Sequence, residues 1–301
     1  MTSKRPNPNG NLEVVLQGGL GNQLFQFFAA LYYSKDVDLR INVNISEYTK
    51  NKSSGLIKRG FALPQFKYLP TYSIVESKRR LNCTRWRRFF VGSQKVSARV
   101  TDCSQSLNVV GDNVKLQGFF QESRFVTAFQ SDIIKWLSLD SEQLMRLISL
   151  ENQFQFQNNV LIHLRLGDYL LLDDFPILSE HTLERILSRL KQLDPSIGNC
   201  YIVTDSQDDH KKLYRNLIAS HNVKLIKTQD VEPAVIIHLL ASAQNLILSK
   251  SSLSWWGGYL STLRGNKVFY PSCIKIRERG CFQSNLALPE WVSFKELLTH
   301  E

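Results

Sequence analysis

Four short segments of the chain concentrate glycines and polar side chains of the kinds that bind anionic or hydroxylated ligands. They are residues 18–23 (GGLGNQ), 163–169 (HLRLGDY), 204–206 (TDS) and 249–258 (SKSSLSWWGG). An arginine can neutralise a diphosphate through two hydrogen bonds, and the backbone N–H groups at a helix start bind phosphate. The residue types therefore indicate binding of a ligand with phosphate or hydroxyl groups, such as a nucleotide.

The elements around three of these segments alternate regularly after residue 160. We expect strands at 160–163, 200–204, 223–226, 246–248 and 267–270, and helices at 180–192, 207–220, 233–243 and 252–263. Such alternation predicts a parallel sheet covered on both faces, with ligands beyond the carboxyl ends of its strands. Residues 163–169, Asp205 and residues 249–254 all fall at such ends.

The N-terminal half begins with a similar strand, glycine turn and helix. The pattern predicts a strand at 12–16, a helix from Asn22 to about Ser34 and a strand at 116–120. A single amphipathic helix is expected over 131–150, and its apolar side is Ile133, Ile134, Leu137, Leu144, Leu147 and Ile148. The polar stretch 151–159 is the best linker, which predicts two domains at 11–152 and 153–301.

Each segment also has a purely structural interpretation. GGLGNQ matches neither dinucleotide nor Walker fingerprints, since Leu24 replaces the third glycine, and it could be a tight turn before a packed helix. Arg165 and Asp168 could form a structural ion pair, Asp205 could cap a turn, and the tryptophans of 249–258 could be core packing. Three polar groups at one strand end favour a functional interpretation of 163–169.

Composition limits the partners. The formal net charge is +10, which favours anionic partners, and the basic aromatic segment 78–90 could contact RNA, anionic lipid or glycan. No RNA-recognition motif accompanies this segment, so we expect no nucleic-acid partner. The Asp-x-Asp at 36–38 reads as a solvated turn, and no metal is expected.

The cellular location is read from cysteines and hydropathy. Five scattered cysteines without a CxxC pair are typical of reduced thiols. The N-terminus lacks the apolar core of a signal peptide, and no run of 18 apolar residues occurs. We expect a cytoplasmic protein, and peripheral association with the inner face of the membrane stays open.

Together the motifs resemble those of glycosyltransferase family 11, the bacterial-type α-1,2-fucosyltransferases. Residues 18–26 (GGLGNQLFQ) resemble the N-terminal motif of the family, 163–169 its His-x-Arg-Arg-Gly-Asp-Tyr and 249–256 its Ser-Asn-Ser-Ser-Phe-Ser-Trp-Trp. The resemblance implies inverting transfer of L-fucose from GDP-β-L-fucose to the 2-hydroxyl of a terminal galactose on a glycan. It also implies no metal or cofactor, and two Rossmann-like domains in the B-type glycosyltransferase arrangement, with the donor at the C-terminal domain.

The same resemblance assigns roles to individual residues. Arg165 would hold the donor diphosphate, His163 would lie near the guanosine and Asp205 would hold the guanine or the ribose. Ser251 and Ser252 would add donors to the phosphate.

The glycine loop (residues 18–23) would lie in the N-terminal domain, opposite the donor-binding domain. With Gly19 and Gly21, Asn22 would reach the donor phosphate or the acceptor from the other domain. Asp168 would orient its loop or contact the ligand, and the nearest carboxylates that could serve as a general base are Asp168, Asp173 and Asp174.

The sequence departs from the family motifs at two positions, and two alternative functions stay open. The second arginine of the family motif is Leu166 here and the asparagine of the serine motif is Lys250. The alternatives are a fucosyltransferase with another acceptor, such as a protein hydroxyl, and a non-catalytic nucleotide-binding or nucleic-acid-binding protein on the same fold. The natural acceptor depends on residues 40–125, and the oligomeric state stays open.

Overall fold

The chain forms two compact units of α/β structure. The computed structural model describes residues 10–35, 39–49, 60–76, 98–101, 113–154, 158–171, 177–206, 211–228, 230–271 and 286–299. Among these, the first unit contains residues up to 49, 60–63 and 69–133, and the second contains 64–68 and 134–299. Each unit is built on its own parallel sheet.

The first unit has five described strands in the order β3-β2-β1-β5-β4, and every neighbouring pair is parallel. The strands are β1 (Asn11–Val15), β2 (Arg40–Asn44), β3 (Ser73–Val75), β4 (Ala98–Thr101) and β5 (Asn113–Gln117). Helix α1 (Leu20–Ser34) packs its aromatic residues into the core of this unit, where Phe27 and Phe28 are fully buried. Short helices α2 (Ser46–Thr49) and α3 (Ser123–Thr127) also belong to this unit. Helices η1 (Leu63–Gln65) and α4 (Gln130–Trp136) begin in this unit and end in residues assigned to the second.

The second unit has six described strands in the order β11-β10-β9-β6-β7-β8. They are β6 (Val160–Leu164), β7 (Cys200–Thr204), β8 (Val223–Ile226), β9 (Asn245–Ile247), β10 (Lys267–Tyr270) and β11 (Val292–Ser293). Taken in chain order this is the 3-2-1-4-5-6 arrangement of dinucleotide-binding folds, whose order reverses between β6 and β9. The predicted parallel α/β sheet is confirmed.

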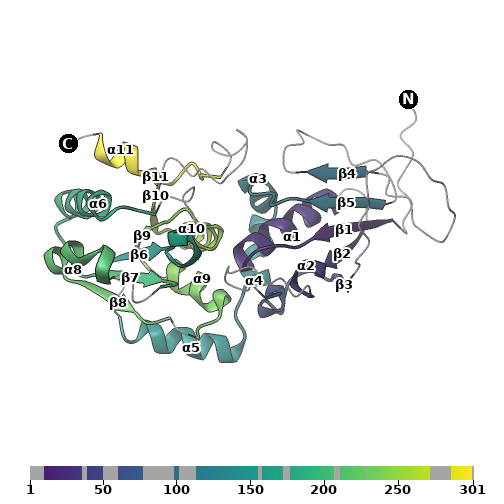
Figure 1. Ribbon diagram of the computed structural model, residues 1–301, viewed down its shortest axis with the longest axis horizontal. Coiled ribbons are helices and arrows are strands. Elements are labelled where there is room, and N and C mark those ends of the chain that lie inside the picture. Colours follow the sequence, from purple (N-terminus) through teal and green to yellow (C-terminus); the bar gives the residue numbers. More distant parts are fainter. Residues whose placement is uncertain are drawn as a thin grey trace. The chain divides into compact units, whose positions relative to one another are not determined.

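Helices cover both faces of this second sheet (Figure 1). They are α5 (Ser141–Glu151), η2 (Gly167–Leu171), α6 (Glu180–Leu193), α8 (Arg215–His221), α9 (Pro233–Ala241), α10 (Ser252–Leu263) and α11 (Phe294–Leu298). Helices α6, α8 and α11 share one apolar core with the sheet, and α9 and α10 pack together on the opposite face. All residues of β6 and β7 are buried, as a parallel sheet covered on both sides requires.

The single helix predicted over 131–150 is wrong. Helix α4 ends at Trp136 and α5 begins at Ser141, because Asp140 and Gln143 form a capping box. The Asp140 carboxylate accepts from the Gln143 N–H at 2.9 Å, and the Asp140 N–H donates to the Gln143 amide oxygen at 3.1 Å. The break rotates part of the predicted apolar side into solvent: Ile133, Leu137 and Leu147 are buried, while Ile134, Leu144 and Ile148 are exposed.

Other boundaries differ less. The strand expected at 116–120 is β5 and ends at Gln117, because the backbone turns at Gly118 and Phe120, both with positive φ. Within the helix expected at 207–220, residues 211–213 and α8 (Arg215–His221) are helical with a turn at Tyr214, and residues 207–210 lie outside the described residues. Helix α5, counted with the first domain in the sequence prediction, lies in the second unit. The segments 36–38 and 78–90 lie outside the described residues.

Close packing of α9 against α10 gives a test of the second unit. A methyl group at Gly257 would lie 2.7 Å from the Leu240 Cβ and 2.9 Å from its Cδ1, and Leu240 is fully buried. We expect Gly257→Ala to lower the free energy of unfolding by about 1–2 kcal/mol, because overpacking outweighs the gain in helix propensity. Denaturant unfolding measures it.

The matched control for this substitution is Gly60→Ala in the first unit. Gly60 is exposed, and a methyl group there would meet no atom within 4 Å. We expect this variant to stay within about 0.5 kcal/mol of the wild type. Equal stability of the two variants would show that the contact between α9 and α10 can accommodate a methyl group without overpacking.

Candidate functional site

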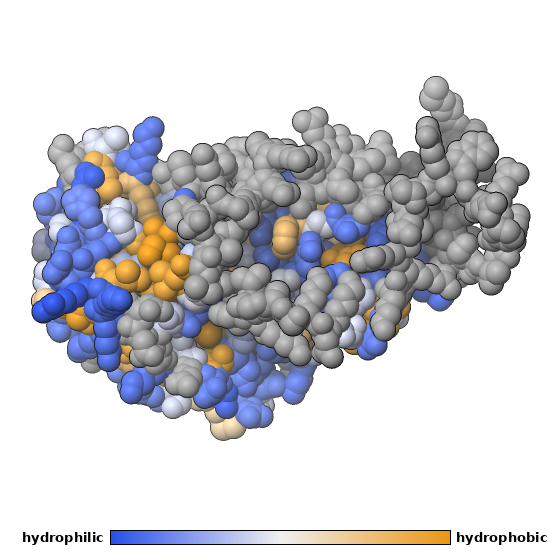
Figure 2. Space-filling view, viewed as in Figure 1, coloured by the Kyte–Doolittle hydropathy of each residue, from blue (hydrophilic) through white to orange (hydrophobic). Residues whose placement is uncertain are grey.

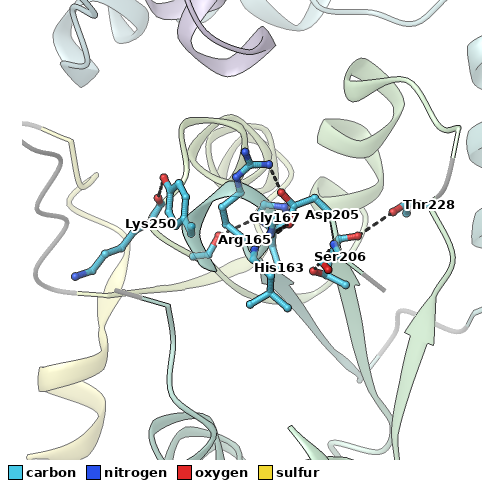
Figure 3. Close-up of polar contacts among 11 residues, drawn as sticks. His163, Arg165, Gly167, Asp205, Ser206, Thr228 and Lys250 are labelled. Atoms are coloured by element: carbon cyan, nitrogen blue, oxygen red, sulfur yellow. Dashed lines mark hydrogen bonds and ion pairs between the residues drawn. The ribbon is translucent and has the colours of Figure 1, made fainter. Parts of the chain in front are cut away.

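The ends of β6, β7 and β9 bring most of the sequence-predicted donor residues together in the second unit. His163 is in β6, Arg165 follows the same strand, Asp205 follows β7, and Ser251 and Ser252 follow β9 at the start of α10. Strands β6 and β9 are neighbours at the point where the strand order reverses, the usual ligand position in such sheets. Figure 3 shows His163, Arg165 and Asp205 next to one another at this edge.

The Asp205 carboxylate is the centre of this arrangement. One oxygen accepts from the backbone N–H groups of Leu166 at 2.8 Å and Gly167 at 3.1 Å. The other oxygen forms an ion pair with the Arg165 guanidinium (Figure 3). The side chains of Arg165 and Asp205 are only 14% and 25% exposed, so water screens the pair less than a surface ion pair. A single carboxylate thus fixes both the arginine and the loop that carries it.

Tyr169 joins the β6 loop to the β9 loop. The Arg165 guanidinium carbon lies 5.5 Å from the centre of the Tyr169 ring, which is within the range of a cation–π contact. The Tyr169 hydroxyl donates to the Lys250 carbonyl at 2.7 Å. The Lys250 side chain extends away from Arg165 in Figure 3, so its ammonium group does not add to the charge beside the guanidinium.

His163 is a buried polar residue of the strand end, with 5% of its surface exposed. Its Nδ1 lies 3.0 Å from the Ser249 hydroxyl oxygen. Burial lowers the pKa of His163 to about 4, against a smaller opposing effect of the Asp205 charge, so the imidazole is neutral at pH 7. The neutral histidine therefore supports the loop before α10 (residues 249–251, the serine loop) through this hydrogen bond.

The serine loop leads into α10, whose start is a possible phosphate position. Ser251 is the N-cap residue and its side chain makes no capping hydrogen bond. The Ser254 hydroxyl instead accepts from the Ser249 N–H at 3.1 Å, which fixes the turn. The first turn of α10 contains no acidic residue, so the positive end of the helix dipole is not neutralised by its own side chains.

The tandem tryptophans of this segment are core residues. Trp255 and Trp256 are 3% and 0% exposed, and Trp255 stacks on Tyr259 with ring centroids 5.2 Å apart. The Trp255 indole N–H donates to the Leu286 carbonyl at 2.7 Å. The structural interpretation of the tryptophans as packing is confirmed, and their contribution to the site is to hold the start of α10.

In the first unit, the glycine loop is held by buried and half-buried side chains. The Gly18 carbonyl accepts from the Gln23 amide at 3.0 Å and from the Tyr48 hydroxyl at 2.9 Å. Gly18 has φ of +80°, and Gly19 is the N-cap residue of α1. The Asn22 amide oxygen accepts from Gln121 at 2.8 Å. Nothing in the sequence singled out Gln121, because it follows β5, far along the chain from the glycine loop.

Several predicted residues have no described side chain. Asp168 is described only through its backbone in η2, and Asp173 and Asp174 lie outside the described residues. Across the described ranges, no group of three or more His, Cys, Asp or Glu residues could hold a metal ion. Within these same ranges, no helix is long and apolar enough to cross a membrane.

A separate cavity of about 320 Å³ lies along α8, away from the predicted site residues. Its lining consists of Ile202, Lys211, Arg215, Ile218, Val223 and Leu225. Figure 2 shows apolar side chains gathered between hydrophilic ones in the part of the view where Figure 1 draws β7 and α8. The cavity lies beside the middle of β7 and β8, whereas the candidate site lies at the carboxyl ends of the strands.

The fold is shared with solved fucosyltransferase structures. The crystal structure of fucosyltransferase NodZ from Bradyrhizobium has a TM-score of 0.52 at 13% identity, and the match covers 84% of this chain and 93% of that chain. The structure of NodZ α-1,6-fucosyltransferase co-crystallised with GDP has a TM-score of 0.51 at 13% identity, covering 84% and 92%. The predicted two-domain B-type glycosyltransferase fold is confirmed.

Sequence relatives define the class of protein. No protein-family model matches the chain. The Escherichia coli α-1,2-colitosyltransferase is 27% identical over 268 residues, which are 81% of this chain and 86% of that protein. The E. coli O-antigen biosynthesis glycosyltransferase WbnK is 24% identical, covering 92% and 98%, and the Caenorhabditis elegans galactoside 2-α-L-fucosyltransferase is 24% identical, covering 86% and 71%.

With this fold and these relatives, the chain is a glycosyltransferase. The resemblance to glycosyltransferase family 11 is confirmed by the same relatives.

Burial of His163 predicts a pH dependence of stability. Its folded-state pKa of about 4 lies below the ordinary value of 6.5, so its stabilising effect is complete above pH 6.5 and is lost as the pH falls toward 4. Between pH 7 and pH 5 we expect the wild type to lose about 2 kcal/mol more stability than His163→Gln, which cannot titrate. Denaturant unfolding at the two pH values measures it.

The control is His181→Gln, which removes an imidazole that is exposed on α6 and should leave the pH dependence of stability unchanged. The prediction fails if His163→Gln keeps the full pH dependence of the wild type. His238, whose pKa burial also lowers to about 4, is present in all three proteins and contributes equally to each.

Proposed function

We propose that the chain transfers L-fucose from GDP-β-L-fucose to the 2-hydroxyl of a terminal galactose, with inversion and without a metal or cofactor. The observation that carries the proposal is the arginine held by Asp205 at the strand-order reversal, next to the uncapped start of α10. It is supported by the galactoside 2-α-L-fucosyltransferase relative and by NodZ structures co-crystallised with GDP and soaked with GDP-fucose.

The charge arrangement suits a leaving nucleoside diphosphate. In the transfer, the galactose O2 attacks the anomeric carbon of fucose while the bond from that carbon to the phosphate oxygen breaks. Negative charge then grows on GDP, and Arg165 with the Ser251 hydroxyl and the Ser252 N–H at the start of α10 would stabilise it. The Ser251 N–H itself donates to the Ser249 carbonyl at 2.8 Å. These positive groups would take the place that a metal ion occupies in other transferases.

Asp205 would act by holding Arg165. The sequence prediction placed its carboxylate on the guanine or the ribose, but both of its oxygens already accept hydrogen bonds from the Arg165 loop. We assign to Asp205 the positioning of this loop, and to His163 the support of the serine loop beside the nucleoside. The general base stays open among Asp168, Asp173 and Asp174.

The two units would divide the substrates between them. The second unit would bind GDP-fucose, and the first unit would present its glycine loop, with Gly19, Gly21 and Asn22, to the galactose-terminated glycan. Transfer of a colitosyl residue in α-1,2 linkage is the second candidate, which the E. coli relative at 27% identity favours.

The test of the proposed function is incubation of the purified chain with GDP-fucose and lactose or N-acetyllactosamine, with and without a chelator. Product linkage is read by NMR, and a parallel reaction uses a colitosyl nucleotide donor. We expect a fucosyl group on the galactose 2-hydroxyl in both the presence and the absence of chelator. Transfer from the colitosyl donor alone would establish the second candidate.

Two further outcomes separate the remaining alternatives. Slow hydrolysis of GDP-fucose without transfer to galactosides would point to another acceptor, such as a protein hydroxyl. Absence of both transfer and GDP binding, with salt-sensitive binding of RNA, would establish a non-catalytic nucleic-acid-binding protein.

Substitution of the arginine tests its role. We expect Arg165→Ala to lower kcat by about 100-fold to 1000-fold, the usual loss when one stabilising donor of a transition state is removed. The control is Arg146→Ala on α5, whose guanidinium pairs with Glu232 at 2.8 Å and which has no part in the proposed site. Undiminished kcat in Arg165→Ala, with a thermal unfolding midpoint like that of the wild type, would remove the arginine from the mechanism.

A further inference from the structure

A buried amide pair lies at the carboxyl ends of β1 and β5 in the first unit. The Gln121 amide nitrogen donates to the Asn22 amide oxygen at 2.8 Å. Strands β1 and β5 are parallel neighbours, so the glycine loop after β1 and the residues after β5 emerge at the same edge of the sheet. The pair thus joins two loops where a parallel sheet places its ligands.

Half of the Gln121 amide has no partner. Its oxygen is buried and accepts no hydrogen bond within the part of the chain that the structure describes, and the residue is 5% exposed. A buried acceptor without a donor is unfavourable, and native proteins keep few of them. The Gln121 amide nitrogen already donates to Asn22, so the atom left for a ligand is the amide oxygen, which needs a hydrogen-bond donor.

The backbone around this amide is held in an unusual conformation. Phe120, the preceding residue, has φ of +51°, which is uncommon for a residue with a side chain. The Gln26 amide, fully buried in α1, donates to the Gly118 carbonyl at 2.9 Å and fixes the turn after β5. Strain of this kind is maintained at sites where a side chain must be aimed.

The neighbouring start of α1 offers the opposite hydrogen-bonding character. Its N-cap residue is Gly19, which has no side chain to cap the helix, and its first turn contains no acidic residue. A methyl group at Gly18 would lie 2.5 Å from the side-chain amide nitrogen (Nδ2) of Asn22, so the loop packs tightly against the Asn22 side chain. The Asn22 and Gln23 N–H groups donate to the Gly19 carbonyl, both at 3.0 Å, so the donor offered to a ligand here is the Asn22 side-chain amide nitrogen, assisted by the positive end of the helix dipole.

We propose that Asn22, Gln121 and the start of α1 form a subsite for a sugar hydroxyl of the acceptor. A hydroxyl can donate to the Gln121 oxygen and accept from the Asn22 side-chain amide nitrogen at the helix start, whereas an ionised phosphate has no proton to give to Gln121. The terminal torsion of a glutamine is soft, so the amide can turn its oxygen toward such a ligand without backbone movement. The inference rests on the proposed function. Of the two ligands that Asn22 could contact, the donor phosphate and the acceptor, it selects the acceptor.

The test is a comparison of Gln121→Met with the wild type in KM for the acceptor and KM for the donor. Methionine matches the length of glutamine and removes both amide groups. We expect the KM for lactose to rise about 10-fold, the effect of one lost hydrogen bond to a substrate, and the KM for GDP-fucose to stay unchanged. Saturation-transfer NMR with lactose alone should show weakened binding, independently of any turnover.

The control is Gln143→Met in the second unit. Gln143 is also a buried amide, but its groups are paired with Asp140 and the Gln65 carbonyl. We expect a larger fall of the thermal midpoint in Gln143→Met than in Gln121→Met, and unchanged KM values. A rise in donor KM for Gln121→Met, or no change in lactose binding, would overturn the subsite. If the wild type transfers no sugar but binds lactose in a Gln121-dependent manner, the proposed reaction fails and the subsite stands.

Discussion

The site of the second unit depends on the carboxylate of Asp205. It accepts two backbone N–H groups from the loop after β6 and pairs with Arg165 on the same loop. The carboxylate holds the arginine in one orientation, so under the proposed function the charge for a leaving diphosphate would be in place before the ligand binds. Tyr169 then ties the loop to the backbone after β9.

Much of the second unit could be predicted from the sequence. Its strands are short apolar runs separated by amphipathic helices, and both signals are local. The order of the strands was not predicted, because right-handed crossovers restrict the possible orders of a parallel sheet without selecting one. The break between α4 and α5 was missed because Ile134, Leu144 and Ile148 continue the apolar period across it. The Asp140 and Gln143 capping box was the signal that could have located it.

The site could be predicted only in part. The motif residues at strand ends were identified because chemistry at such ends is a property of the fold. The partners of those residues were not, since the pairing of Asp205 with the Arg165 loop and of Asn22 with Gln121 joins positions far apart in the chain. A carboxylate alone has the same sequence signature whether it contacts a ribose or a backbone N–H. The geometry around Asp205 shows its backbone partners, the Leu166 and Gly167 N–H groups, which the sequence could not reveal.

The aromatic core around α10 has a practical consequence for studies of folding. Of the five tryptophans in the chain, Trp136, Trp255, Trp256 and Trp291 belong to the second unit, and Trp86 lies outside the described residues. The first unit is built on phenylalanine and tyrosine, such as Phe27, which emit weakly when tryptophan is excited selectively. Intrinsic tryptophan fluorescence therefore follows chiefly the second unit, and circular dichroism follows both. The two optical signals can separate the unfolding of one half of the enzyme from that of the other.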